Sequence, residues 1–157
     1  MNKIKKGVII AAGLQLANMV SKSGIGVKAY DSINAGYGLE HFINGTTQVG
    51  ALAGLTLAAY GITDFAVKKA VPIAGEKTAK IASLTSATSV AYALSQTDIF
   101  REALYSMGAY NQQLQRAVEA IATLGMSVGV VAAGTLFAKD VYDYTSAKIK
   151  ASLGKSK

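Results

Sequence analysis

The sequence predicts an all-α protein, a bundle of four apolar helices that form a single helical membrane-associated domain over residues 1–157. Three observations predict this class. Apolar residues make up 51% of the chain and charged residues only 16%, whereas soluble domains carry about 25% charged residues. Four long segments contain almost no charge, and the chain has one proline, Pro72. No stretch alternates polar and apolar residues for long enough to predict strands.

The four apolar segments differ in how well they fit a bilayer, which needs about 20 mainly apolar residues for one helical crossing. Residues 49–67, with Asp64 as the one charge, and the uncharged residues 120–138 come close to this length. We predict that both span a membrane. Residues 7–21 and 81–97 are also free of charge but are shorter. They could cross at a tilt or in a thin membrane, lie at its surface, or be buried against other helices.

The beginning of the chain, with basic residues before an apolar run, is similar to a signal peptide. It lacks a clear small-residue cleavage site, and Gln15 and Asn18 interrupt the apolar run. We therefore expect this segment to be retained in the protein.

The lysines are sorted to one side of the predicted membrane. If all four segments cross, the N-terminus, the 68–80 loop and the C-terminus share a side. That side carries Lys3, Lys5, Lys6, Lys68, Lys69, Lys77, Lys80, Lys139, Lys148, Lys150, Lys155 and Lys157, and the other side carries Lys22, Lys28, Arg101 and Arg116. This is the positive-inside pattern of membrane proteins. It predicts a membrane location with both termini on the lysine-rich side.

The two halves of the chain, 1–75 and 76–157, follow a similar plan. Each has a weaker apolar segment, a polar stretch with tyrosines, and then a stronger apolar segment that contains glycines. Gly50 and Gly54 of the first half recur in the second half as Gly125 and Gly129, with the same spacing. This suggests an internal repeat.

Small residues form two stripes at helical spacing within the stronger apolar segments. The stripes consist of Gly50, Gly54 and Ala58, and of Gly125, Gly129 and Ala133. In lipid, small residues let two helices approach closely, and this contact drives helix association. The stripes therefore predict either self-association between copies of the chain or packing between helices of one chain.

A heptad pattern of apolar residues runs from Asp98 towards the last apolar segment. Its members are Phe100, Leu104, Met107, Asn111, Leu114, Val118 and Ile121. Asn111 is the polar member, and a buried amide in such a seam can fix the register of two helices. Asp98 is a candidate N-cap, and one long helix could run from there into residues 120–138, with Gly108 as the expected break. The alternative is an amphipathic helix on the protein or on the bilayer surface.

Few residues could support catalysis or metal binding. The chain has no cysteine and one histidine, His41, so thiolate sites are excluded and a histidine site lacks partners. Asp64 lies one helical turn before Lys68, which predicts an ion pair that reaches water rather than a proton path. We expect no catalytic residues, no cofactor and no metal, and therefore no enzyme.

The C-terminal tail is rich in lysine, with Lys148, Lys150, Lys155 and Lys157. It has no interleaved aromatic residues that would stack on bases. These lysines could contact anionic lipid headgroups or nucleic-acid phosphates without sequence preference. Alternatively, they only set the orientation in the membrane.

In its glycine stripes and heptad pattern, the chain resembles the small, basic, alanine- and glycine-rich coat and membrane proteins of some viruses, such as spindle-shaped archaeal viruses. This resemblance concerns general character over most of the chain. It implies a virion subunit whose lysine-rich side faces packaged nucleic acid. The function we expect is a structural subunit of a membrane-containing or hydrophobic-walled assembly, whose partners are the lipid bilayer, copies of itself and that nucleic acid.

Two alternatives stay open. A holin-like or pore-forming protein would use the same stripes to build an oligomer, with a polar face that lines water: Thr85, Ser86, Thr88 and Ser89. An accessory subunit of a larger membrane complex would instead bury the stripes against unlike partners.

Overall fold

The computed structural model describes residues 2–32, 36–108 and 111–153, and within these ranges it contains six helices and no strand. The helices are α1 (Asn2–Ser21), α2 (Gly24–Ser32), α3 (Gly36–Ala70), α4 (Glu76–Ser95), α5 (Asp98–Ser106) and α6 (Gln112–Leu153). The all-α prediction is confirmed.

Local sequence signals mark the helix ends. Pro72, which has no backbone N–H, follows the end of α3 and starts the turn to α4. The hydroxyl of Thr97 accepts a hydrogen bond from the backbone N–H of Phe100 (3.4 Å) and so caps α5. After α5, Gly108 takes a φ of +66°, a conformation that favours glycine at a helix end.

The long helix that could run from Asp98 into residues 120–138 is not continuous. The chain breaks between α5 and α6, at the position of Gly108 that the sequence marks as the expected break. Asn111 is exposed, and its side-chain oxygen accepts a hydrogen bond from the N–H of Gln113 at 2.8 Å. It therefore caps the start of α6 and does not lie in a buried seam.

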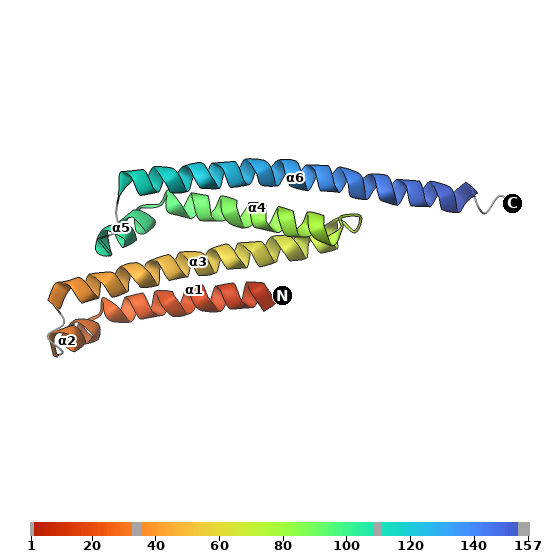
Figure 1. Ribbon diagram of the computed structural model, residues 1–157. Helices are drawn as coiled ribbons and strands as arrows, with labels where there is room; N and C mark the ends of the chain where they lie inside the picture. The colour runs from red at the N-terminus through yellow and green to blue at the C-terminus, as the bar shows by residue number, and fades with distance from the viewer. Residues whose placement is uncertain (1, 33–35, 109–110, 154–157) are drawn as a thin grey trace.

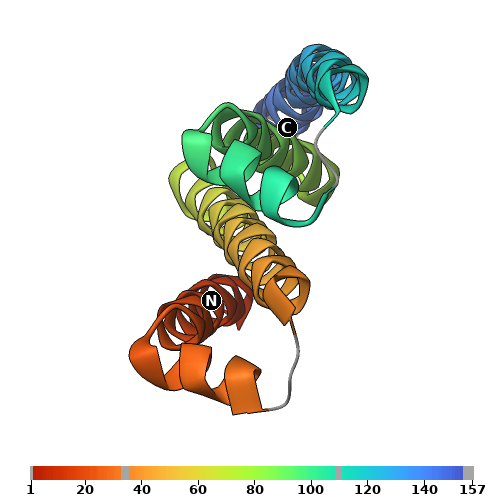
Figure 2. The same ribbon diagram turned by 90° about the vertical axis from the view of Figure 1, so that its left-hand side faces the viewer.

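The four long helices lie in an open row in the order α1, α3, α4, α6 (Figure 1). Each packs on its neighbour in this order, whereas among the described residues α1 touches neither α4 nor α6, and α3 does not touch α6. The end view shows the helices stepping away from one another in sequence (Figure 2). The predicted four-helix bundle is therefore not confirmed, because no central core is shared by all four helices.

Neighbouring helices in the row run in opposite directions. The short helices α2 and α5 lie at one end of the long helices. The start of α1 and the α3–α4 turn lie at the opposite end of the long helices (Figure 1). The last part of α6 extends past its neighbours at this second end.

The two halves of the chain are built alike. Helices α1, α2 and α3 have 20, 9 and 35 residues, and α4, α5 and α6 have 20, 9 and 42. The helices of the first half begin at positions 2, 24 and 36, and their counterparts begin at positions 76, 98 and 112. Gly54 lies against Ala11, and Gly129 lies against Thr85, which has the same place in α4 that Ala11 has in α1. A duplication as the origin of this pattern stays a prediction.

The interior of the row contains small residues. The apolar residues described as buried are all alanines, while Ile9, Leu124 and Val131 are exposed by 59%, 65% and 69%. The accessible surface is 10258 Å², whereas a compact soluble protein of 16.2 kDa exposes about 7,500 Å². The chain thus leaves a large apolar surface for another medium or another molecule to cover.

Candidate membrane and self-association surfaces

The first glycine stripe brings the backbones of α1 and α3 together. A Cβ atom at Gly54 would lie 2.7 Å from the backbone nitrogen of Ala11 and 2.8 Å from the carbonyl oxygen of Gly7. Ala58 is buried against Gly7 one turn further along, and Gly50 faces the side chain of Leu14. Only small residues permit so close an approach.

The second stripe has the same role between α4 and α6. Gly129 lies against the side chain of Thr85, and a Cβ atom at Gly125 would be 3.6 Å from the methyl group of Thr88. Ala133, the third member, is half-buried. Both stripes are therefore occupied within one chain, which is one of the two possibilities that the sequence leaves open. Self-association through these stripes stays an untested prediction.

Polar side chains add hydrogen bonds between the helices. The amide of Asn18 in α1 donates to the carbonyl oxygen of Asn44 (3.1 Å) and to the hydroxyl of Thr47 (3.0 Å), both in α3. Thr63 in α3 donates to the hydroxyl of Ser86 in α4 at 2.8 Å. In an apolar medium such bonds hold helices together. The interruption of the first apolar run at Asn18 was the sequence signal for the first of these contacts.

The polar face of α4 is engaged within the chain. Thr85 lies against Gly129 and Ser86 bonds to Thr63. Thr88 and Ser89 each donate a hydrogen bond to a backbone carbonyl one turn earlier in α4, at 2.9 Å. This face therefore serves contacts with α3 and α6 in a single chain.

Asp140 in α6 ties down the start of α4. Its carboxylate accepts hydrogen bonds from the backbone N–H of Gly75 (2.7 Å) and from the hydroxyl of Thr78 (2.6 Å). The first N–H groups of a helix have no partner inside the helix, so a carboxylate from a neighbouring helix can cap them. The contact joins residues that are far apart in the sequence, and the sequence alone did not predict it.

We expect Asp140→Asn to loosen the α4–α6 contact at this end. A charged capping acceptor contributes about 1–2 kcal/mol, and the amide keeps the size of the side chain but loses its charge. Amide hydrogen exchange should become faster at residues 75–79 and stay unchanged in α1. Asp143→Asn, at an exposed carboxylate one turn further along α6, is the matched control. Equal exchange rates in both variants would contradict the capping role.

The helix contacts align the four apolar segments at one level. The pairs Gly54–Ala11, Thr63–Ser86 and Gly129–Thr85 connect residues 49–67, 7–21, 81–97 and 120–138 from one helix to the next. As helices, segments of this size have lengths of about 22–28 Å. This approaches the ~30 Å hydrocarbon thickness of a bilayer. The charged residues accordingly lie mainly towards the two ends of the long helices, outside the level of these segments.

The lysine-rich end contains exposed ion pairs. Lys68 lies 2.9 Å from Asp64, which confirms the predicted pair, and Lys80 lies 2.9 Å from Glu76. The hydrogen bond from Lys80 lowers the pKa of the Glu76 carboxyl, and the same bond raises the pKa of Lys80. Because both partners are exposed, the pair adds little stability. The Lys3 ammonium lies 4.1 Å from the centre of the Tyr60 ring, where a cation is attracted to the ring.

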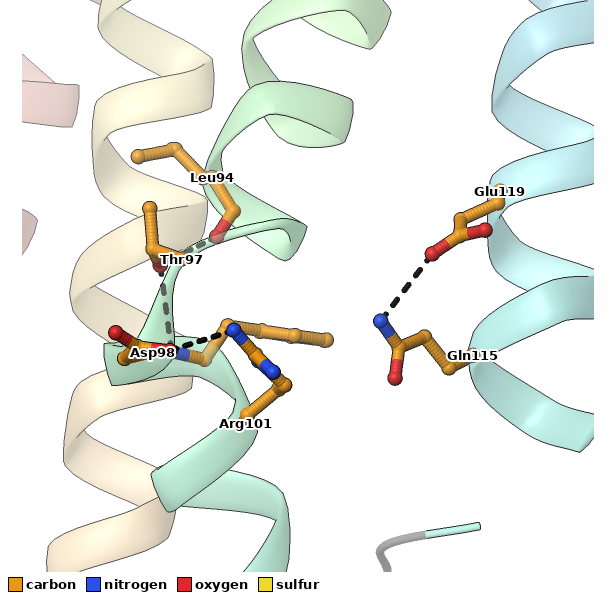
Figure 3. A network of polar contacts seen from close by, with 7 residues as sticks. Leu94, Thr97, Asp98, Arg101, Gln115 and Glu119 are labelled. Atoms are coloured by element: carbon orange, nitrogen blue, oxygen red, sulfur yellow. Dashed lines mark hydrogen bonds and ion pairs between the residues drawn. The ribbon is translucent and has the colours of Figure 1, made fainter. Parts of the chain in front are cut away.

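The opposite end has a separate polar network (Figure 3). Arg101 pairs with Asp98 beside the Thr97 cap of α5. Glu119 in α6 accepts hydrogen bonds from Gln115 (3.2 Å) and from Gln96 at the end of α4 (3.1 Å). Of these contacts, the bond between Gln96 and Glu119 joins α6 to the end of α4.

A cavity of about 780 Å³ lies at this same end, between the start of α3 and α5. Its polar lining includes His41, Asp98, Arg101 and Glu102. Arg101 is paired with Asp98. Within the described ranges, no three histidine or acidic side chains lie close enough together to hold a metal ion.

The C-terminal lysines lie on the free end of α6 or beyond it. Lys148 and Lys150 are exposed on the last turns of the helix. Lys155 and Lys157 lie outside the described residues. No described residue pairs with Lys148 or Lys150 through an ion pair, so both ammonium groups are available to an anionic partner.

Two helical stretches are long and apolar enough to cross a membrane, namely Gly38–Ala70 and Gln115–Leu153. They contain the two segments that the sequence predicts to span. Helices α1 and α2 are separated by a bend, and the two together would make a third span if such a bent pair is taken as a single crossing. In the most apolar part of α3, 22% of the residues are buried within the chain, and in that of α6 none is. Of these two spans, the one in α6 is therefore the more exposed.

Comparison with protein families, curated proteins and solved structures finds no match to this chain.

Proposed function

We propose that this chain is a non-enzymatic structural subunit of a membrane, or of an equally apolar-walled layer, and that it packs side by side with copies of itself. The distribution of side chains carries the proposal. Alanine, glycine and polar residues lie between the helices, and large apolar residues face outward. Soluble domains bury their large apolar residues, whereas helices in lipid pack through small residues and polar bonds.

The open row supports the self-association part of the proposal. Among the four long helices, as far as they are described, the inner helices α3 and α4 each have two neighbours, and the edge helices α1 and α6 each have one. A closed bundle would cover such edges within one chain. Here both edges carry exposed aliphatic residues, such as Leu16 in α1 and Val128 in α6. Contact with lipid and with other copies would cover them.

The charge distribution supports an orientation. The start of α1, the α3–α4 turn and the end of α6 lie towards the lysine-rich end (Figure 1). By the positive-inside rule this end faces the cytoplasmic side of the membrane. In the most concrete form of the proposal the chain is a viral coat or virion membrane protein. Its lysines, among them Lys148 and Lys150, then contact anionic headgroups or packaged nucleic acid.

Reconstitution into phosphatidylcholine liposomes tests this function. We expect the protein to resist alkaline carbonate extraction, to form regular arrays or tubes in electron micrographs, and not to release a trapped dye. Gly134→Leu, at an open position on α6, should keep the protein in the membrane and reduce the arrays. Gly38→Leu, at an open position near the start of α3, is the matched control and should preserve them.

Other outcomes would favour other functions. Dye release would favour the pore-forming alternative, although no described contact supports it. A monomer in mild detergent that captures unlike subunits would favour an accessory role. Protein that stays soluble and monomeric without detergent would overturn the membrane assignment itself.

A further inference from the structure

We infer that the outer face of α6 binds the outer face of α1 in a second copy of this chain, by the same type of contact that joins α3 to α4 within one copy. This inference rests on the proposed function and identifies the surfaces through which the copies meet. It replaces the glycine stripes, which are occupied within the chain, with two surfaces that are free.

The similarity of the two halves provides the first step. In the first half, α1 packs on α3, and in the second half α4 packs on α6. The halves are joined by contact of α3, the last helix of one half, with α4, the first helix of the next. By the same rule α6, the last helix of the second half, would contact the first helix of a further half. In this chain only α1 of a second copy can take that place.

The outer face of α6 has the positions required for such a contact. The α3 side of the α3–α4 contact includes Leu52, Ala53 and Thr56. In the register that places Gly125 and Gly129 on Gly50 and Gly54, their equivalents line a shallow apolar groove of about 360 Å³ on α6: Ser127, Val128 and Val131. Val128 and Val131 are 66% and 69% exposed. The face of α3 that α4 covers therefore has an uncovered counterpart on α6.

The outer face of α1 is the counterpart. On α4, Ser86 bonds to α3 and Leu94 lines the cavity between these two helices. The residues at the same places in α1 are Ala12 and Val20, and both are exposed, Val20 by 59%. Leu16 between them is 61% exposed. An exposed apolar stripe thus runs along α1 from Ala12 to Val20.

The direction of the helices agrees with this pairing. Neighbours in the row are antiparallel, and α6 and α1 also run in opposite directions (Figure 1). A second copy added at α6 would therefore continue the alternation and bring its lysine-rich end to the same side. Because the two faces differ, the contact does not close and extends the row from copy to copy.

Cysteine cross-linking tests the contact, since the chain has no native cysteine. Thr63 and Ser86 have their hydroxyl oxygens 2.8 Å apart, and their equivalents across the inferred contact are Ala138 and Ala12. In liposomes, oxidised Ala12→Cys/Ala138→Cys protein should give a ladder of dimers, trimers and longer chains. Thr63→Cys/Ser86→Cys should give a disulfide within one chain. Ala12→Cys/Val130→Cys, with the second cysteine about 12 Å away along α6, should give about tenfold less intermolecular product.

The single variants separate the possible geometries. A mixture of Ala12→Cys and Ala138→Cys proteins should give dimers and no longer products, and neither protein alone should cross-link. Efficient dimers of either single variant would overturn the inference, because they indicate a symmetric contact between like faces. If the double variant resists carbonate extraction but gives no ladder, the inference fails and the membrane assignment stands. If it is extracted, the proposed function fails as well.

Discussion

Substitution of Gly54 by leucine is expected to separate α1 from α3. A Cβ atom at this position would already lie 2.7 Å and 2.8 Å from backbone atoms of Ala11 and Gly7. Backbone atoms in two packed helices cannot move aside as a flexible side chain can. Overpacking of an interior typically costs about 1–3 kcal/mol, and we expect the loss here to reach the upper end of that range.

The measurement uses fluorophores at Asn2→Cys and Ala70→Cys, which are the only cysteines in the labelled protein. Energy transfer between α1 and α3 should be lost at a lower SDS concentration in Gly54→Leu than in the parent. Gly13→Leu is the matched control, because nothing lies within 4 Å of a Cβ atom at Gly13. Glycine is about 0.8–1.0 kcal/mol less favourable than alanine inside a helix, and leucine ranks close to alanine, so the control should be unchanged or slightly more stable. A similar response of both variants would contradict the close α1–α3 contact.

Substitution of Val130 by lysine is expected to impair membrane insertion of α6. Val130 is 63% exposed and lies near the middle of residues 120–138. A lysine at the centre of a spanning helix costs about 2.5–3.5 kcal/mol. At an exposed position of a soluble protein the same change would shift stability by no more than about 0.5 kcal/mol. The expected effect is therefore specific to a lipid-facing surface.

The fraction of protein that resists carbonate extraction reports insertion. It should fall in Val130→Lys and stay at the parent level in Tyr142→Lys, where the residue is 72% exposed but lies past the uncharged segment. Undiminished insertion of Val130→Lys would indicate that this face of α6 meets water or a polar partner.

The sequence predicted the helices well because length, low charge and helix-end residues are local properties. The two strongest apolar segments, 49–67 and 120–138, lie in the two stretches that can cross a membrane. Gly108 was expected as the break in the last helical region, and the chain does turn there. A proline or a glycine acts on its own neighbours, so its effect can be predicted without the rest of the fold.

The arrangement of the helices was not predictable in the same way. A bundle is inferred from apolar faces that need a common core, but here the buried residues are alanines and polar groups. Hydrophobic periodicity therefore does not identify which faces meet. Asn111 is an example, because the heptad pattern placed it in a seam, whereas the break at Gly108 leaves it free to cap α6. The Asp140 contact joins residues far apart in sequence, and no local pattern identifies such a pair.

The unequal length of neighbouring helices has a consequence for any layer built from this chain. Helix α6 has 42 residues, about 63 Å, and its neighbour α4 has 20, about 30 Å. Past the Asp140 contact with α4, the remainder of α6 continues to Leu153 for about 20 Å, and no other described helix lies beside it. In a layer these ends of α6 would project from the surface side by side. There would be one projecting end for every four helices, which is a spacing of roughly 35 Å. Headgroups extend only about 5–8 Å beyond the hydrocarbon, so Lys148 and Lys150 would lie beyond the lipid. A large polyanion that approaches from that side would therefore contact the projecting ends of α6 before it reaches the bilayer.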